Sequence, residues 1–394
     1  MKKHLLLIAN ILLLVSLSAQ KPSLTKAYNN FYDKDYDKAK EQIDLCIADE
    51  KLAAKAQTWL YKGNIEFLLA NREYSAKQQD QNYQIRYPNA PEDAFDAFEK
   101  ALSINPKVEA MDMMNANDAL KQLYPYLLVR GVDQLIAKDI NGAKRTLAKG
   151  IKSYEMDTPQ YPMNGELYYY YAYALESLGE TDEMMKYYQK ALDDGSQNAY
   201  VFAKLIDQYK AENDRTNAEK ALATAKQKNP NDMSVRLLEI DYAYWAGDSV
   251  KAKTLLDQID DRSLTTADEM VNVANFYIKE KRYENAERLL TRANAVSPNN
   301  FVIFYNLGVC NYSFSEYYFN QQNQLAIKQG NPEDIKMAKD NCEHYLQKAA
   351  DYFEQARAMQ PNDVNLLNTL RAIYVRQQSP KADEIDALIK QLEK

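Results

Sequence analysis

The sequence is poor in glycine and in cysteine, and each shortage argues against a class of fold. Ten glycines in 394 residues are too few for the many tight turns of a β-sandwich or β-barrel. The three cysteines are Cys46, Cys310 and Cys342, an odd number that cannot all be paired within one chain. Each lies in a helical apolar pattern, so we expect each to pack as a small hydrophobic residue.

Positive charge is also scarce. The 49 lysines and arginines are outnumbered by 56 aspartates and glutamates, which gives a formal net charge of −7. A surface that binds nucleic acid or anionic lipid needs clustered basic residues, and the sequence has no such cluster. We therefore expect no nucleic-acid partner.

Long apolar segments are missing except near the first residue. Two lysines precede an almost wholly apolar stretch from Leu5 to Leu17, and the small residues Ser18 and Ala19 follow. This order is typical of a secretory signal peptide, and the stretch is too short to cross a bilayer of about 30 Å as a helix. We predict a signal peptide over residues 1–19, cleaved near Ala19 or alternatively at Ser18. The sequence thus predicts export to the periplasm, or to the outer membrane or cell surface of a Gram-negative bacterium, without stable membrane insertion after cleavage.

What the sequence does contain is an internal repeat. Small or apolar residues recur every 34 residues in the central half of the chain. One series is Ala218, Ala252 and Ala286; a second is Ala172, Ile206, Ile240, Ala274 and Gly308; a third is Ala191, Ala225, Ile259 and Ala293. Small side chains that recur at one period mark positions where two helices approach closely.

The apolar spacing inside each repeat is helical. In the repeat from Tyr200 to Pro230, two apolar groups with steps of three and four are separated by a polar turn; they are Phe202, Leu205, Ile206 and Tyr209, then Ala218, Leu222 and Ala225. Proline follows the second group, here and at Pro298 in a later repeat. Each repeat is therefore predicted to be a pair of antiparallel helices that stacks on its neighbours to bury its apolar faces.

These residues resemble the signature of the tetratricopeptide-repeat (TPR) family. The signature has an aromatic residue, Leu, a small residue and Tyr, then Ala, Phe, Ala and Pro; the repeat above departs from it at Ile206 and Leu222. Looser matches lie on both flanks. They are Trp59, Gly63, Ala94, Phe98, Ala101 and Pro106 on one side, and Phe304, Leu307, Gly308, Ala349, Phe353, Ala356 and Pro361 on the other. The resemblance implies an all-α fold: a right-handed α-solenoid of antiparallel helix pairs (a TPR superhelix), here with two extended hairpins.

The repeats also predict the organisation of the chain. After the signal peptide at 1–19 we expect N-terminal TPR-like repeats over 20–155 with an insertion at 70–92, a possible hinge at 156–165, five TPR repeats over 166–361 and capping helices over 362–394.

Two repeats are longer than the family pattern. The insertion at 70–92 is interpreted as an extended helix and a loop, with Pro91 opening the next helix. In the last repeat, Asn331 and Pro332 are typical of a helix start. If its extra residues are shared equally, each helix gains about 14 residues, or roughly 21 Å.

Residues suited to catalysis or metal binding are few. His344 is the sole histidine after residue 19, and no phosphate loop, paired-cysteine motif or metalloprotease helix occurs. Asp33, Asp35 and Asp37 have the spacing of calcium-loop ligands, but Lys38 occupies the position where that loop needs glycine. We therefore predict no enzyme, no metal and no cofactor, and interpret the three aspartates as a turn.

The resemblance also implies where a partner binds, because first helices line the inner groove of the TPR solenoid. The corresponding residues here are Tyr169, Tyr173, Tyr200, Asp207, Lys210, Asp241, Tyr244, Trp245, Asn275, Lys279, Tyr305 and Tyr312. Tyrosine and tryptophan give large contact areas at low entropic cost. The alternative is that most of the 31 tyrosines pack between helices. The lysine–asparagine clamp of the chaperone-binding members is absent, since Val271 stands at its first lysine position.

Three classes of function remain at this point. The first is a scaffold that binds protein or peptide partners through its groove and extended hairpins. The second is a glycan-binding or small-molecule-binding component of an outer-membrane uptake system. The third, an enzyme, has the least support in the sequence.

Overall fold

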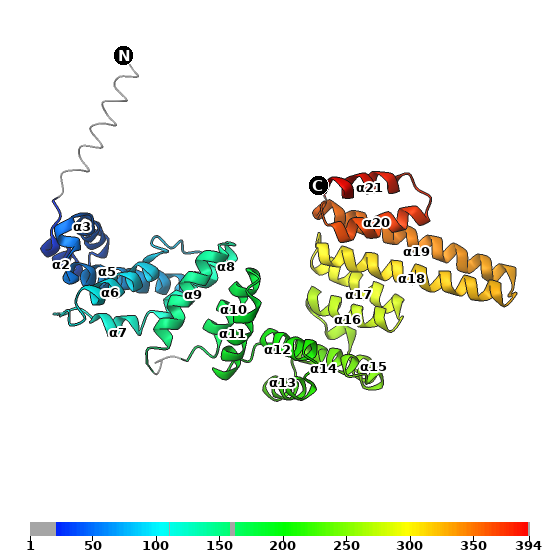
Figure 1. Cartoon of the computed structure of the whole chain (residues 1–394), viewed down its shortest axis with the longest axis horizontal. Helices are drawn as coiled ribbons and strands as arrows, with labels where there is room; N and C mark the ends of the chain where they lie inside the picture. Colours follow the sequence, from blue (N-terminus) through cyan, green and yellow to red (C-terminus); the bar gives the residue numbers. More distant parts are fainter. Residues whose placement is uncertain (1–20, 110, 158–161, 393–394) are drawn as a thin grey trace, which may run out of the picture. The chain divides into compact units, whose positions relative to one another are not determined.

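The computed structural model describes residues 21–109, 111–157 and 162–392, and these residues form α-helices without any strand. The predicted fold class is confirmed: the chain is all-α and built from antiparallel helix pairs (Figure 1). The predicted signal peptide at 1–19 lies outside the described residues.

The chain divides into two compact units, Met1–Gln208 and Tyr209–Lys394. The division falls inside helix α12 (Ala199–Ala211). The predicted hinge at 156–165 lies within the first unit, and its residues 158–161 are outside the described residues. The hinge therefore stays a prediction.

The first unit consists mainly of helix pairs, with two short helices between them. Its helices before α12 are α2 (Leu24–Tyr32), α3 (Tyr36–Ala48), α4 (Glu50–Ala53), α5 (Ala56–Gln79), α6 (Ala90–Ile104), α7 (Ala116–Leu120), α8 (Tyr124–Ile136), α9 (Ile140–Tyr154), α10 (Glu166–Ser177) and α11 (Thr181–Asp193). The packed pairs are α2 with α3, α5 with α6, α8 with α9 and α10 with α11.

The second unit continues the same arrangement. Its helices are α13 (Arg215–Lys228), α14 (Met233–Trp245), α15 (Ser249–Asp257), α16 (Ala267–Lys279), α17 (Tyr283–Val296), α18 (Phe301–Ile327), α19 (Pro332–Met359), α20 (Val364–Arg376) and α21 (Lys381–Leu392), with a single 3₁₀ turn, η1 (Asp261–Ser263). Packed pairs are α14 with α15, α16 with α17, α18 with α19 and α20 with α21.

Six of the turns between consecutive helices have the same local form. One residue adopts a left-handed backbone, and the next residue is the N-cap of the following helix. The left-handed residue is Lys34, Lys138, Gly179, Asn213, Gly247 or Lys281. The next residue is often an aspartate whose carboxylate accepts a backbone N–H of the new helix, as Asp139 does from Gly142 at 2.9 Å. Asp33, Asp35 and Asp37 belong to such a turn, as the sequence analysis predicted, because Asp35 caps α3.

The small residues predicted to lie at helix contacts are buried. Ala218, Ala252 and Ala286 have no exposed surface, and Gly308 is buried as well. A Cβ atom added to Gly308 would lie 2.6 Å from the ring of Phe353. Gly63 has the same relation to Phe98, also at 2.6 Å. The 34-residue period therefore does report close helix approach.

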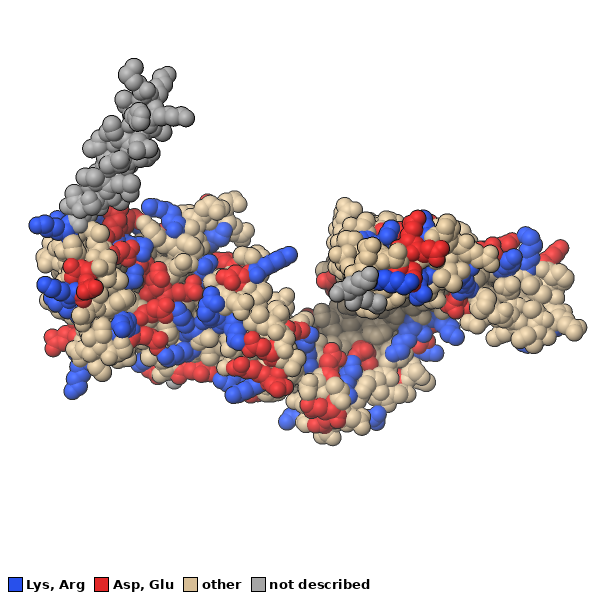
Figure 2. All heavy atoms as spheres, turned by 45° about the horizontal axis from the view of Figure 1, so that its top comes forward, with Lys and Arg blue, Asp and Glu red and all other residues tan. Residues whose placement is uncertain are grey.

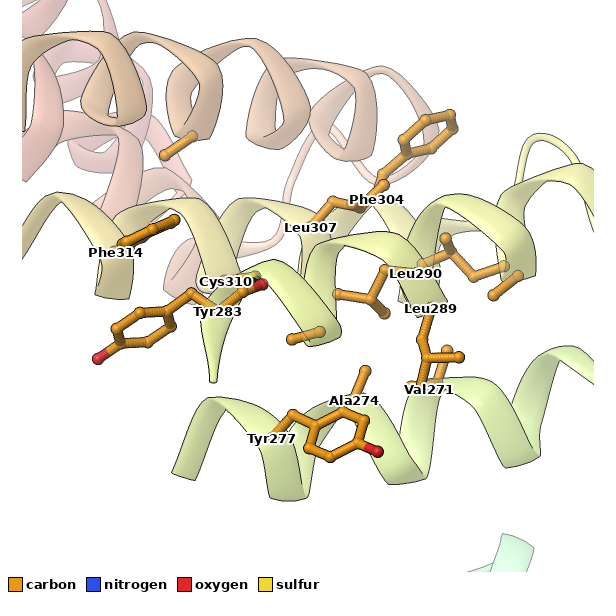
Figure 3. Close-up of a cluster of buried hydrophobic side chains, with 14 of the residues drawn as sticks. Val271, Ala274, Tyr277, Tyr283, Leu289, Leu290, Phe304, Leu307, Cys310 and Phe314 are labelled. Carbon is orange, nitrogen blue, oxygen red and sulfur yellow. Dashed lines mark hydrogen bonds between the residues drawn. The ribbon is translucent and has the colours of Figure 1, made fainter. Parts of the chain in front are cut away.

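The largest core cluster of the second unit joins its successive helix pairs. Figure 3 shows Val271, Ala274 and Tyr277 of α16 facing Leu289 and Leu290 of α17, with side chains of α18 beyond them. All of these side chains belong to one buried cluster. Each pair thus completes its core on the next pair, as expected of a repeat array.

The last repeat is extended as predicted. Helices α18 and α19 have 27 and 28 residues, against 13 and 14 in α16 and α17. Asn331 caps α19 through a hydrogen bond from the backbone N–H of Glu333, and Pro332 lies in its first turn. Both helices project past the ends of the neighbouring pairs (Figure 1). We call the projecting part, residues 317–343, the arm.

The insertion at 70–92 has a different form. Helix α5 runs on to Gln79, and Pro91 lies in the first turn of α6. The buried carboxylate of Glu73 secures the loop between them: it accepts the Tyr83 hydroxyl at 3.1 Å and the backbone N–H of Arg86 at 2.7 Å. Arg72 lies 2.9 Å from the same carboxylate, so the buried charge is paired.

Candidate partner-binding surfaces

Three of the predicted groove residues come together in the first unit. Tyr169 and Tyr173 lie one turn apart on α10, and both rings contact Tyr200 of α12, at centroid distances of 6.2 and 6.4 Å. Tyr188 of α11 joins them, 6.1 Å from Tyr200. We call these four residues the tyrosine cluster. Its members differ in access to solvent, since Tyr188 is fully buried and Tyr173 is 39% exposed.

A carboxylate that sequence reasoning missed organises this cluster. Glu176 accepts the hydroxyls of Tyr188 at 2.6 Å and Tyr200 at 3.0 Å, and it forms an ion pair with Lys204. Burial alone would raise the pKa of Glu176, but the hydrogen bonds from Lys204 and the two tyrosines outweigh burial and hold the pKa below its usual value. The carboxylate stays ionised and keeps the rings of Tyr188 and Tyr200 in one orientation.

A second aromatic group lies in the second unit. The Tyr244 ring stacks on the Phe276 ring, with 5.8 Å between their centres, and the ammonium group of Lys279 lies 4.0 Å from the centre of the Tyr244 ring. The Tyr244 hydroxyl donates to Glu280 at 2.8 Å, and Lys253 lies 2.9 Å from the same carboxylate. The predicted pair Tyr244 and Lys279 therefore makes direct contact.

Both groups share one chemical arrangement. In each, a tyrosine hydroxyl donates to a glutamate whose charge is balanced by a lysine, so the polar tip of the ring is fixed while part of the ring stays accessible. Burial and the hydrogen bond to Glu280 raise the pKa of Tyr244. Burial likewise raises the pKa of Tyr200. These hydroxyls therefore stay protonated near neutral pH, where they present neutral hydrogen-bonding and stacking groups and not anions.

Other predicted residues are placed near these groups or apart from them. Lys210 and Asp241 form an ion pair with each other. Trp245 is half-buried, with its ring 5.5 Å from that of Tyr242 and 5.9 Å from the guanidinium of Arg215. Asp207 is exposed near the end of α12.

The remaining three predicted residues lie on α16 and α18. Asn275 is exposed on α16. Tyr305 packs edge-on against Phe353 at 5.5 Å, whereas Tyr312 lines a hollow of about 430 Å³ at the base of the arm. No observation of the structure tests whether any of the twelve residues touches a partner, so their role stays a prediction.

A further hollow contains none of the residues that the sequence predicted for partner binding. It measures about 800 Å³ and lies between the second half of α5 and the start of α8, with Phe67, Tyr74, Tyr124 and Tyr126 among its walls. Amide groups of Asn71, Gln78 and Gln122 line it as well. The extension of α5 supplies several of these residues, so the insertion at 70–92 was the one available signal.

The acidic and histidine residues of the described part of the chain are dispersed. Within 21–109, 111–157 and 162–392, no three histidine, cysteine, aspartate or glutamate residues are grouped as a metal site. None of the helices described is both long and apolar enough to cross a membrane. His344 is exposed on α19, with its ring 5.1 Å from Tyr345.

Known proteins provide an independent comparison. A model of the tetratricopeptide repeat matches residues 165–193, which span α10, its turn and α11. No curated protein sequence matches the chain significantly.

Several solved structures are similar in arrangement at low sequence identity. Human IFIT1, solved as a dimer with PPP-AAAA, is 16% identical, with 83% of this chain and 72% of that chain covered and a TM-score of 0.44. Yeast Tom70 is 12% identical, with 93% and 90% covered and a TM-score of 0.44. A tetratricopeptide repeat protein from Parabacteroides merdae is 14% identical, with 64% and 98% covered and a TM-score of 0.37.

The family model matches one helix pair. Several other pairs have the same left-handed turn residue and bury small residues at their helix contacts. Such repeats indicate a role in protein interaction or as a scaffold, because stacked helix pairs present extended surfaces. The chain therefore carries a tetratricopeptide repeat at residues 165–193, within a series of helix pairs of similar form.

Proposed function

We propose that this protein is an exported, non-catalytic scaffold of the cell envelope that binds a protein or peptide segment along its first helices and extended hairpins. One observation carries the proposal: the partly exposed rings of Tyr200 and Tyr244 are each held in a fixed orientation by a hydrogen bond to a glutamate that is paired with a lysine. Rings that are already ordered lose little entropy when a partner binds. Neutral hydroxyl tips beside lysines suit the polar backbone of a peptide.

Binding by the tyrosine cluster is tested with Tyr173→Ala. Tyr173 is 39% exposed, so its removal should weaken binding of a captured partner or peptide by roughly tenfold, or about 1.4 kcal/mol. Melting should change little. The matched control is Tyr32→Ala, which removes a ring that is 68% exposed on α2. Equal binding by both variants and the wild-type protein, measured by calorimetry, would reject the cluster as a contact surface.

Export is tested separately from binding. We expect the protein recovered from the cell envelope to begin at Gln20, which N-terminal sequencing and intact mass would reveal. Recovery in the cytoplasm with residues 1–19 intact would contradict the export proposal and leave the binding proposal standing.

A second function is favoured by the hollow between α5 and α8. Its volume of about 800 Å³ lies in the range of small-molecule sites, and aromatic walls with a few amides are their usual lining. A glycan or another small molecule of an outer-membrane uptake system would fit this chemistry. Calorimetry with a panel of saccharides and peptides separates the two functions: saccharide binding that is lost in Tyr126→Ala, with no peptide binding, would establish the second and exclude the first.

A further inference from the structure

The outer part of α18 has an unusual composition. The eleven residues from Tyr317 to Ile327 contain no charged side chain, although Glu316 and Lys328 flank them directly. Aromatic residues and the amides asparagine and glutamine make up most of the stretch. In Figure 2 the end of the arm is correspondingly a mostly uncharged surface, in contrast to the mixed charges elsewhere. Depletion of charge with enrichment of aromatic residues is the mark of an interface core.

This uncharged surface is exposed on one side of α18. Tyr317, Asn320, Gln324 and Ile327 follow one another at steps of three, four and three, which places them on one face of the helix. All four are exposed; Tyr317 retains 44% and Ile327 82% of its surface. We call these four residues the arm stripe. Over the eleven residues it runs for about 16 Å.

Four of the six charged residues that the facing helix contributes to the arm are paired within that helix, and the other two, Glu333 and Asp334, lie in its first turn. On α19, Lys336 lies 2.9 Å from Asp340, and Lys339 lies 3.7 Å from Glu343. The arm therefore offers a partner little net charge.

The order of residues in the arm stripe is the same in both directions. It reads large apolar, amide, amide, large apolar, with symmetrical spacing. A surface that meets its own copy across a twofold axis must be self-complementary, and amides satisfy this because each both donates and accepts hydrogen bonds. The geometry points to a second copy of this chain as the occupant of the arm stripe, paired antiparallel with the twofold axis near Gln322.

In that pairing Asn320 of each copy lies opposite Gln324 of the other, and Tyr317 lies opposite Ile327. The hollow of about 430 Å³ at the base of the arm, lined by Tyr312, Tyr317, Asn320 and Gln324 among others, receives the Ile327 side chain of the second copy. The acidic chain, with a net charge of −7, repels its own copies elsewhere, so contact is favoured where charge is missing.

The surface is small compared with a specific interface of standard size, which has roughly 20–30 residues a side. We therefore expect a dissociation constant in the range of about 1–100 μM. Sedimentation equilibrium of the purified full chain across this range should show a reversible monomer–dimer equilibrium. This inference concerns contact between copies, and it is independent of which partner the first helices bind.

Charge placed on the arm stripe tests the pairing. The double variant Asn320→Glu with Gln324→Glu brings four carboxylates together at the axis and should weaken the dimer by at least about tenfold. The variant Asn320→Lys with Gln324→Lys should do the same. An equimolar mixture of the two should form a heterodimer, because each glutamate then faces a lysine.

A control variant carries the same change of net charge elsewhere. Gln227→Glu with Asn368→Glu alters two exposed amides on α13 and α20 and should dimerise like the wild-type protein. Circular dichroism and melting establish that every variant is folded. A wild-type chain that stays monomeric over the whole range, arm variants that dimerise as tightly as wild type, or a mixture without heterodimer would each overturn the proposal.

Discussion

Replacing Gly308 with alanine should destabilise the last repeat, although alanine is the better helix former. In an exposed helix the change would stabilise by about 1 kcal/mol. Here the new Cβ atom would lie 2.6 Å from two ring atoms of Phe353 and 2.8 Å from a third, about 1 Å closer than carbon atoms pack. Phe353 is 1% exposed and its ring contacts Tyr305, so the ring has no free space to enter.

Overpacking of this kind costs about 1–3 kcal/mol. After the helix-propensity gain we expect a net loss of up to about 2 kcal/mol in the second unit. Because repeat arrays need not unfold in one step, the appropriate assay is hydrogen exchange with mass spectrometry, which gives the local opening free energy of α18 and α19.

The cause is isolated by a double-mutant cycle with Phe353→Leu. In the Phe353→Leu variant, whose side chain is smaller, Gly308→Ala should no longer destabilise the repeat and should instead stabilise it by up to about 1 kcal/mol. The coupling energy should therefore equal the overpacking cost of about 1–3 kcal/mol. If Gly308→Ala protects the α18 amides better than glycine in the wild-type background, or if the two changes are additive, close approach of helices is the wrong explanation for the 34-residue period.

Three other predictions follow from the same features. Ala286→Leu, at a fully buried position, should cost about 1–3 kcal/mol through overpacking, and an unchanged melting curve would contradict the predicted repeat register. Lys138→Gly should stabilise the first unit by up to about 1 kcal/mol, because Lys138 has a φ of 63° that costs less for glycine; a lower melting temperature than wild type would count against this. Glu280→Gln should lower the melting temperature at neutral pH and reduce its fall in acid. Burial raises the pKa of Glu280, but the hydrogen bonds from Lys253 and Tyr244 lower it by more, so the pKa in the folded state is below its usual value. The ionised carboxylate therefore stabilises the fold fully above the pKa of the unfolded state, and this stabilisation is lost as pH falls through the pKa of the folded state. Exposed Glu284→Gln is the control, and identical pH profiles for the two variants would refute the role of Glu280.

The sequence was sufficient for the helix pairs because their signals are local or periodic. Proline, asparagine and aspartate mark helix starts, as Asn331 and Pro332 do for α19, and burial of Ala218, Ala252 and Ala286 follows from their period. The extra length of the last repeat could be divided equally between α18 and α19 because the two helices of an antiparallel hairpin pack along their full length only when they are equally long.

The partners of the candidate site could not be predicted in the same way. Helical periodicity shows which face a tyrosine occupies, but not which carboxylate on another helix its hydroxyl reaches. Glu176 binds tyrosines from α11 and α12, and that depends on the crossing of three helices. The hollow between α5 and α8 depends likewise on how side chains of α5 meet Met114, Gln122 and the start of α8, and that packing leaves no periodic trace in the sequence.

The nearly equal lengths of α18 and α19 limit how the reach of the arm can change. A single residue added to one helix alone turns everything beyond it by about 100°. An addition to α18 ahead of Phe314 would in this way separate the rings of Phe314 and Tyr345, which are 4.1 Å apart. Seven residues added to both helices make about two whole turns, preserve the facing sides and lengthen the projection by about 10 Å. The span of the protein is therefore adjustable in steps, by paired insertions near Gly330, while the stack that supports the arm keeps its geometry.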